Sequence, residues 1–203
     1  MFGALSARLL ASAIMAMRPS RYIEVGSGFS SAVVLDVNEE FRSDDPIACT
    51  FIEPVPDRLD SILTETDREH CTILEQPLQA TDPEMFSALE PGDVLFVDSS
   101  HVLKTGSDVC MLLFDVLPML RSGVYIHFHD ILYPFDYPLS WSKEQNRSWN
   151  ETYALRAFLM HNDQYKIHFW CDYFSLFGHD AIRETGFNSM IDSRQSSIWL
   201  VKA

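Results

Sequence analysis

The stretch RYIEVGSGFSS (residues 21–31) decides the fold. A short apolar strand (21–25) runs into two glycines, Gly26 and Gly28, and then into a helix-like run. A strand that turns through glycines into a helix is typical of an open α/β sheet. The turn is either a ligand-binding loop or a tight corner of a packed sheet, and the stretch alone does not decide between them.

The rest of the chain repeats this alternation. We expect strands at 21–25, 47–53, 71–76, 93–98, 123–130, 165–171 and 196–202, and helices at 30–38, 56–65, 83–89, 105–120 and 150–161. The first five strands are apolar on both faces, as in a parallel sheet covered by helices on both sides. The last two strands have only irregular sequence between them (172–195), which predicts an antiparallel hairpin with a long excursion. The pattern indicates an α/β, Rossmann-like fold of seven strands, mostly parallel.

The bulk composition narrows the class of protein. With 203 residues, of which 47% are hydrophobic, the chain suits one domain spanning 1–203. Its net charge of −14 argues against nucleic acid or an anionic membrane as a partner and fits a small-molecule ligand. The cysteines lie far apart, which indicates reduced thiols, and the apolar run at 1–17 indicates a helix covering the sheet rather than a signal peptide. No stretch is long and apolar enough to span a bilayer, so we expect a cytoplasmic protein.

Polar residues follow the ends of the predicted strands, where ligands bind in open α/β sheets. Glu53 ends the second strand, where a carboxylate can accept hydrogen bonds from both ribose hydroxyls of a nucleoside. No basic residue flanks the glycine turn in the sequence to meet a pyrophosphate, and the third glycine of the dinucleotide fingerprint is absent. A ligand with a ribose and no phosphate therefore fits better than NAD.

The ordered motifs IEVGSGFSS (23–31), FIEP (51–54) and VLFVDSSHV (94–102) resemble the cofactor motifs of class I S-adenosylmethionine-dependent methyltransferases. The segments IHFHDILYPFDYP (126–138) and WNETYALRAFL (149–159) are similar to a bacterial group of small-molecule methyltransferases related to the catechol and macrolide-sugar O-methyltransferases. The resemblance covers roughly residues 10 to 170. It implies the seven-stranded methyltransferase sheet, S-adenosylmethionine as cofactor, and O-methylation of a small molecule or a sugar.

The resemblance also implies a set of cofactor contacts. The residues assigned to the cofactor are Glu24, Gly26, Ser27, Gly28, Glu53, Gln79 and Asp98. The glycine turn meets the methionine part, whose amino end Glu24 holds through water. Glu53 binds the ribose, Gln79 lies by the adenine ring, and Asp98 lies beneath the sulfonium.

The metal-dependent catechol type implies a second site. There, an acid after the fourth strand and an acid–amide pair after the fifth hold Mg²⁺, and a lysine three residues past the first acid is the base. The same positions here carry Asp98, the pair His129 and Asp130, and His101. The resemblance thus implies a divalent metal (Mg, Mn, Fe or Zn) on Asp98, His129 and Asp130, with His101 as the base. Because His129 replaces a carboxylate, Mn²⁺, Fe²⁺ or Zn²⁺ suits the set better than Mg²⁺.

A metal-free site is the alternative, with His101 or His129 as a plain general base. His127 alternates with His129 along the strand, so both should point the same way, and we interpret His127 as a core histidine.

The segment 131–149 follows a strand end and combines prolines with aromatic residues, which predicts a lid or an acceptor loop. Its aromatic residues would wall the acceptor pocket: Tyr133, Phe135, Tyr137, Trp141 and Trp149. The alternative is a packed lid or a subunit contact in a homodimer. Asn150 and Glu151 begin the next helix, where Asn150 has N-cap character or faces the acceptor.

Two other functions remain open from the sequence. One is a non-catalytic S-adenosylmethionine-binding protein of the same fold, against which the acids and histidines at the strand ends weigh. The other is a nicotinamide-dependent oxidoreductase, against which the incomplete glycine fingerprint and the absence of a second nucleotide-binding half weigh.

Overall fold

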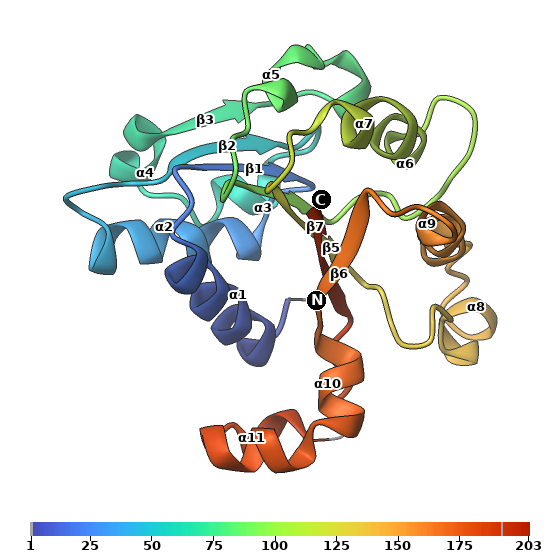
Figure 1. Cartoon of the computed structure of the whole chain (residues 1–203). Helices are drawn as coiled ribbons and strands as arrows, with labels where there is room; N and C mark the ends of the chain where they lie inside the picture. The colour runs from blue at the N-terminus through green and yellow to red at the C-terminus, as the bar shows by residue number, and fades with distance from the viewer. Residues whose placement is uncertain (1, 192) are drawn as a thin grey trace.

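A computed structural model describes residues 2–191 and 193–203. Its strands form a seven-stranded sheet in the order β3-β2-β1-β4-β5-β7-β6 (Figure 1). Their bounds are β1 Arg21–Val25, β2 Ala48–Ile52, β3 Cys71–Leu74, β4 Val94–Val97, β5 Tyr125–His129, β6 Tyr165–Trp170 and β7 Ser197–Lys202. Strands β1 to β5 pair in parallel, whereas β7 is antiparallel to β5 and β6. The predicted fold and all seven predicted strands are confirmed.

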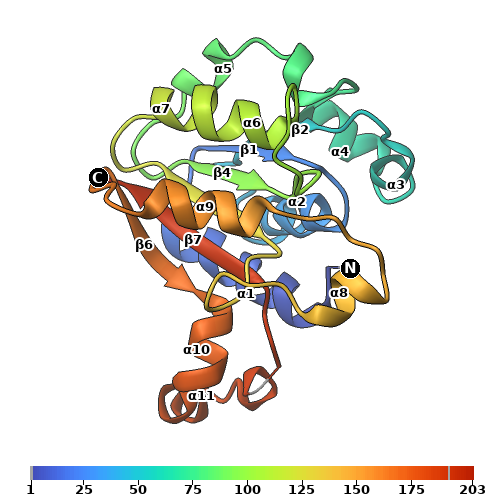
Figure 2. The same ribbon diagram turned by 90° about the vertical axis from the view of Figure 1, so that its right-hand side faces the viewer.

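Helices cover both faces of the sheet, as the doubly apolar strands require (Figures 1 and 2). On one face lie α1 Ala4–Met17, α2 Phe29–Phe41 and α3 Asp57–Asp60, packed against side chains such as Tyr22 and Phe96. On the other lie α5 Glu84–Ser87, α6 Asp108–Met111, α7 Leu117–Met119 and α9 Glu151–Leu159, over side chains such as Ile23 and Leu95. The predicted N-terminal helix is confirmed as α1, and no helix in the described part of the chain is long and apolar enough to cross a membrane.

Three predicted segments differ from the structure. The predicted helix at 56–65 is split, because α3 ends at Asp60 and α4 Glu65–His70 begins after the N-cap Thr64. The predicted helix at 105–120 contains a π-helical segment, Leu112–Val116, between α6 and α7. The loop at 131–149 contains a short helix, α8 Leu139–Lys143.

The prediction that 172–195 is irregular is wrong. This region contains most of α10 Cys171–Phe177, all of α11 His179–Thr185, and a 3₁₀ turn at Asn188–Met190, and both helices extend below the sheet in the two views (Figures 1 and 2). Each helix has seven residues, which is too short for a hydrophobic period of 3.6 to stand out in the sequence.

The strand order places the site. Strand order reverses between β1 and β4, so the carboxyl ends of these neighbours open a crevice at the edge of the sheet.

Candidate active site

The glycine turn after β1 is fixed by a close approach of two backbones. Gly26 has φ +84°, and a Cβ at this position would lie 1.8 Å from the carbonyl oxygen of Asp98. The turn is tied to its neighbours by hydrogen bonds from the Gly26 N–H to the Ile52 carbonyl (3.0 Å) and from the Asp98 N–H to the Val25 carbonyl (2.8 Å). Glycine is thus required at position 26 by the packing of β1 against β4 as well as by its conformation.

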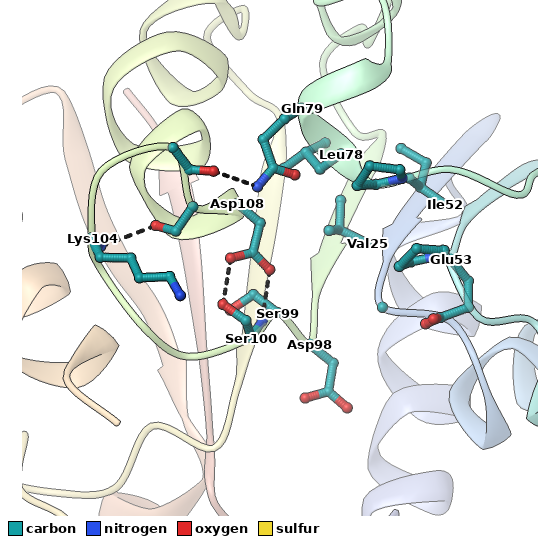
Figure 3. Close-up of a pocket in the computed structure, with 15 residues that line it drawn as sticks. Val25, Ile52, Glu53, Leu78, Gln79, Asp98, Ser99, Ser100, Lys104 and Asp108 are labelled. Carbon is teal, nitrogen blue, oxygen red and sulfur yellow. Dashed lines mark hydrogen bonds between the residues drawn. The ribbon is translucent and has the colours of Figure 1, made fainter. Parts of the chain in front are cut away.

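A cleft of about 550 Å³ opens beside this turn (Figure 3). Its walls bring together Gly26 and three side chains that the resemblance assigns to the cofactor: Glu53, Gln79 and Asp98. Glu53 is half-buried, accepts a hydrogen bond from the Val55 N–H (3.0 Å), and has a pKa raised by burial. The Gln79 amide donates to the Gly106 carbonyl (2.8 Å), toward the other end of the cleft in Figure 3.

Glu24 occupies a different position from these three. Its side chain is fully buried and accepts hydrogen bonds from the Ser30 hydroxyl and the Ser31 hydroxyl (3.1 Å), at the start of α2. Burial raises the pKa of Glu24 to about 8. Glu24 does not line the described cleft, so it anchors the first turn of α2 behind the glycine turn.

A second group of polar side chains lies where β4 and β5 end. One ligand atom each from Asp98, His101 and Asp130 falls within 4.8 Å of the others. The His101 Nε2 atom is 3.2 Å from Asp98 Oδ1 and 3.9 Å from Asp130 Oδ2. His129 lies at the margin of this group, with its Nε2 atom 3.8 Å from Asp130 Oδ1. The compact trio therefore contains His101, whereas the set implied by the resemblance has His129.

The Glu151 carboxylate contacts the His101 ring on the side away from the polar group, an arrangement that the sequence did not reveal. The Glu151 side chain is buried, with one carboxylate oxygen 2.8 Å from His101 Nδ1 and the other accepting from the Ser99 hydroxyl (2.8 Å). Burial lowers the pKa of His101, but hydrogen bonds to Asp98 and Glu151 outweigh it and raise the pKa to about 10. In this arrangement the ring is doubly protonated at neutral pH, and its Nε2 atom faces Asp98 and Asp130.

The other predicted histidine is a core residue. His127 is buried, stacks on Phe96 with ring centroids 4.2 Å apart, and its ring nitrogens have no hydrogen-bond partner among the described residues. Burial holds its pKa well below the usual value, so the ring is neutral. His127 and His129 do lie on the same side of β5, since both rings contact Phe96.

The loop at 131–149 reaches this site through Arg147 and Trp149. The Arg147 guanidinium lies close to the rings of both Trp141 and Trp149, 4.4 and 4.3 Å from their centroids, and 3.9 Å from Asp130. Trp149 in turn packs on His101, with ring centroids 4.0 Å apart. A separate cavity of about 360 Å³ is lined by residues of this loop together with Tyr153.

The sequence predicts no basic residue beside the glycine turn, but the fold brings one into contact with it. Arg58 of α3 lies against the turn, with its Cδ atom 3.1 Å from the position that a Cβ on Gly28 would take. The sequence hid this contact because Arg58 follows the end of β2 and not the turn itself.

The sequence matches the methyltransferase domain family over residues 23–131, so the chain belongs to this family. The match runs from β1 to just past β5 and includes both groups of polar residues described above. This membership confirms the predicted family and the predicted class of enzyme.

Comparison with individual proteins agrees with this assignment. An uncharacterized protein of Archaeoglobus fulgidus is 42% identical over 79 residues, which are 38% of this chain and 34% of that protein. The alignment therefore spans about a third of the relative's length.

Solved structures share the fold at low sequence identity. The S-adenosylhomocysteine-bound methyltransferase PaMTH1 of Podospora anserina has a TM-score of 0.61 at 13% identity, over 100% of this chain and 80% of its own. The O-methyltransferase TomG of Streptomyces achromogenes is involved in tomaymycin synthesis and is bound to S-adenosylmethionine. It has a TM-score of 0.57 at 11% identity, over 99% of this chain and 81% of its own. CmcI with magnesium and S-adenosylmethionine has a TM-score of 0.56 at 14% identity, over 99% of this chain and 72% of its own.

Proposed function

We propose that the protein transfers the methyl group of S-adenosylmethionine to a hydroxyl group of a small molecule, with help from a divalent cation. The observation that carries the proposal is the trio Asp98, His101 and Asp130, which lies directly beside the cleft that contains Glu53. Asp98 belongs to both groups and so links the cofactor cleft to the polar trio. PaMTH1 and TomG bind S-adenosylhomocysteine and S-adenosylmethionine, which supports the choice of cofactor.

The cleft can hold the cofactor through contacts that this chain supplies. Glu53 would accept hydrogen bonds from the ribose hydroxyls, and Gln79 lies at the end where the adenine would sit. When bound, the cofactor supplies a methyl group on a positively charged sulfur, and Asp98 would face that charge. The transfer is an in-line displacement, which needs alignment and an available nucleophile but no covalent intermediate.

The trio fits a divalent cation. Its donors are two carboxylates and the imidazole Nε2, which would release its proton when a cation binds, and this mixed set suits Mn²⁺, Fe²⁺ or Zn²⁺. A buried carboxylate behind the distal nitrogen of a metal-binding histidine is the usual way that proteins orient such a ligand, and Glu151 is placed in this way against His101. A bound cation would lower the pKa of the acceptor hydroxyl. The CmcI structure contains magnesium and S-adenosylmethionine, which supports a divalent cation together with this cofactor.

This assignment leaves His129 as the residue that accepts the acceptor's proton. It lies next to Asp130 and lines a cavity that also contains Asp98, so a base there would be close to the reacting end of the cofactor. In the metal-free alternative, His129 is the base as well, because Asp98 and Glu151 raise the pKa of His101 and keep its ring doubly protonated at neutral pH.

Calorimetry with S-adenosylmethionine, S-adenosylhomocysteine and NAD tests the cofactor. We expect both S-adenosyl ligands to bind and NAD not to bind. Binding of NAD without binding of S-adenosylhomocysteine would refute the proposal. Transfer of a radiolabelled methyl group to a panel of catechols and sugars then tests the acceptor class, and chelation followed by addition of Mn²⁺ tests the cation.

A further inference from the structure

The loop at 131–149 brings one positive charge to the polar trio. The Arg147 Nη1 atom lies 3.9 Å from Asp130 Oδ2, and the same oxygen is 3.9 Å from His101 Nε2. Arg147 also lines the aromatic cavity of about 360 Å³ in this loop. It therefore stands where that cavity meets the trio, and it has been given no role in the reaction so far.

The Arg147 guanidinium is held in position, but its N–H groups are unused. The rings of Trp141 and Trp149 contact it on their faces, with centroids 4.4 and 4.3 Å away. Its side chain donates no hydrogen bond to any residue within 2–191 and 193–203, because the 3.9 Å separation from Asp130 is too long for one. The side chain is 31% exposed, so a ligand can reach it. Five N–H donors in one plane without an acceptor are suited to a planar anion.

The acidic and hydroxyl side chains of the same cavity already have hydrogen-bond partners. The Asp136 carboxylate accepts a hydrogen bond from the Tyr153 hydroxyl (2.6 Å). The Ser142 hydroxyl donates to the Leu139 carbonyl (3.1 Å), and the Tyr137 hydroxyl accepts from a backbone N–H of α9 (3.2 Å). Arg147 is therefore the charged group of this cavity whose hydrogen bonds a ligand would complete.

A carboxylate suits this position better than a phosphate. Two acids lie near the guanidinium, Asp130 at 3.9 Å and Asp136 in the same cavity, and both would repel a doubly charged group. A carboxylate carries one charge and can accept two parallel hydrogen bonds from the guanidinium. The aromatic rings around Arg147 favour a flat ligand.

We propose that Arg147 binds a carboxylate of the methyl acceptor, so that the acceptor is an aromatic hydroxy acid, an inference that rests on the proposed function. The hydroxyl lies at the trio, beside Asp98, and the carboxylate lies at Arg147. One aromatic ring can carry both groups, because Arg147 and His101 flank the same oxygen of Asp130. An acceptor held at two points presents its hydroxyl to the methyl group in one orientation.

The test compares two acceptors that differ only in the anionic group: protocatechuate, a dihydroxybenzoate, and its primary amide. Their affinities are measured by calorimetry at physiological ionic strength on protein saturated with S-adenosylhomocysteine. We expect the acid to bind the wild-type protein about 10-fold more tightly than the amide. Because the net charge of −14 repels anions, a preference for the acid indicates a cation within the site.

Arg147→Gln should remove this preference by weakening the binding of the acid about 10- to 100-fold more than that of the amide. Arg147→Lys should keep part of it, because lysine retains the charge and loses the bidentate geometry. Loosening of the loop in these variants acts on both acceptors, so the ratio of the two affinities isolates the carboxylate. Lys143→Gln is the matched control, since it removes one positive charge from an exposed position of the same loop that does not line the cavity. It should leave the ratio at the wild-type value.

Three results overturn the inference: equal binding of the acid and the amide to the wild-type protein, a ratio that Arg147→Gln leaves unchanged, or binding of neither acceptor. The proposed function stands in all three cases as long as S-adenosylhomocysteine binds the wild-type protein. Failure of S-adenosylhomocysteine to bind overturns both.

Discussion

Gly26 has no Cβ atom, and this lets the ends of β1 and β4 lie close together. The cofactor cleft depends on this close approach. Gly26→Ala should lower the free energy of unfolding by about 3 kcal/mol or more, because a positive φ and a backbone clash add together. Gly186→Ala is the matched control, since Gly186 also has positive φ (+76°) but has nothing within 4 Å of its added Cβ. Its free energy of unfolding should fall by only about 1–2 kcal/mol, with both variants measured by urea titration. Equal losses would show that the contact with Asp98 does not constrain the turn.

Glu24 should make stability depend on pH. Its pKa is about 8 in the folded protein against 4.5 in the unfolded chain, so the folded state binds more protons between these values. Stability from this group is therefore greatest below pH 4.5 and declines as pH rises to 8. Glu24→Gln keeps a neutral hydrogen-bonding side chain and should flatten this decline in melting curves taken across that range. A decline of the same size in the variant would contradict the assignment.

Glu151 should act on cation binding through His101. Glu151→Gln should weaken Mn²⁺ binding by about 10- to 100-fold, as expected when the carboxylate behind a histidine ligand is lost. Affinity for S-adenosylhomocysteine should stay within about 2-fold, because Glu151 does not line the cofactor cleft. Glu144→Gln, on the exposed part of the preceding loop, serves as the control for loss of one charge. Unchanged Mn²⁺ binding in Glu151→Gln would show that Glu151 does not support a cation ligand at His101.

Among the helices and strands, the sequence predicted correctly those whose hydrophobic pattern is clear. Strands β1 to β5 and helices α1, α2 and α9 follow from apolar runs and a helical period, and the polar residues at the strand ends gather because parallel strands end at one edge. Glu151, Arg58 and Arg147 could not be predicted as neighbours of the site. They come from helices and a loop whose approach to the sheet depends on tertiary packing, which leaves no local pattern in the sequence.

The loop at 131–149 should depend on Arg147 for its order. The guanidinium contacts two tryptophan rings, and cation–π contacts contribute about 0.5–2 kcal/mol each. Arg147→Ala should therefore raise the population of an open loop by about 5-fold or more, which speeds cleavage after Lys143 of α8 by endoproteinase Lys-C. Arg156→Ala, on the exposed side of α9, is the control. A cleavage rate unchanged by Arg147→Ala would mean that other contacts hold the loop.

At the scale of the whole molecule, the net charge of −14 limits what the protein can bind and how its stability responds to salt. The expectation that it binds neither nucleic acid nor membranes stays a prediction, as do a cytoplasmic location and a homodimer. The same charge complicates any test of the cation site, because every salt screens the self-repulsion of an acidic chain and so stabilises it. A site-specific effect of Mn²⁺ must therefore be separated from general screening.

Comparison at equal ionic strength makes this separation. MnCl₂ should raise the melting temperature more than KCl does, by about 5 °C when Mn²⁺ is at 100 times its dissociation constant, because only Mn²⁺ binds the folded trio. Asp130→Asn should abolish this excess and keep the response to KCl, since Asp130 is one of the three ligands and a single charge changes general screening little. If the wild-type protein responds equally to the two salts, or if Asp130→Asn keeps the excess, the cation does not bind at Asp98, His101 and Asp130. The transfer reaction then has to proceed without a cation and with His129 as the base, because the hydrogen bonds of the ligand-free site hold His101 doubly protonated between Asp98 and Glu151.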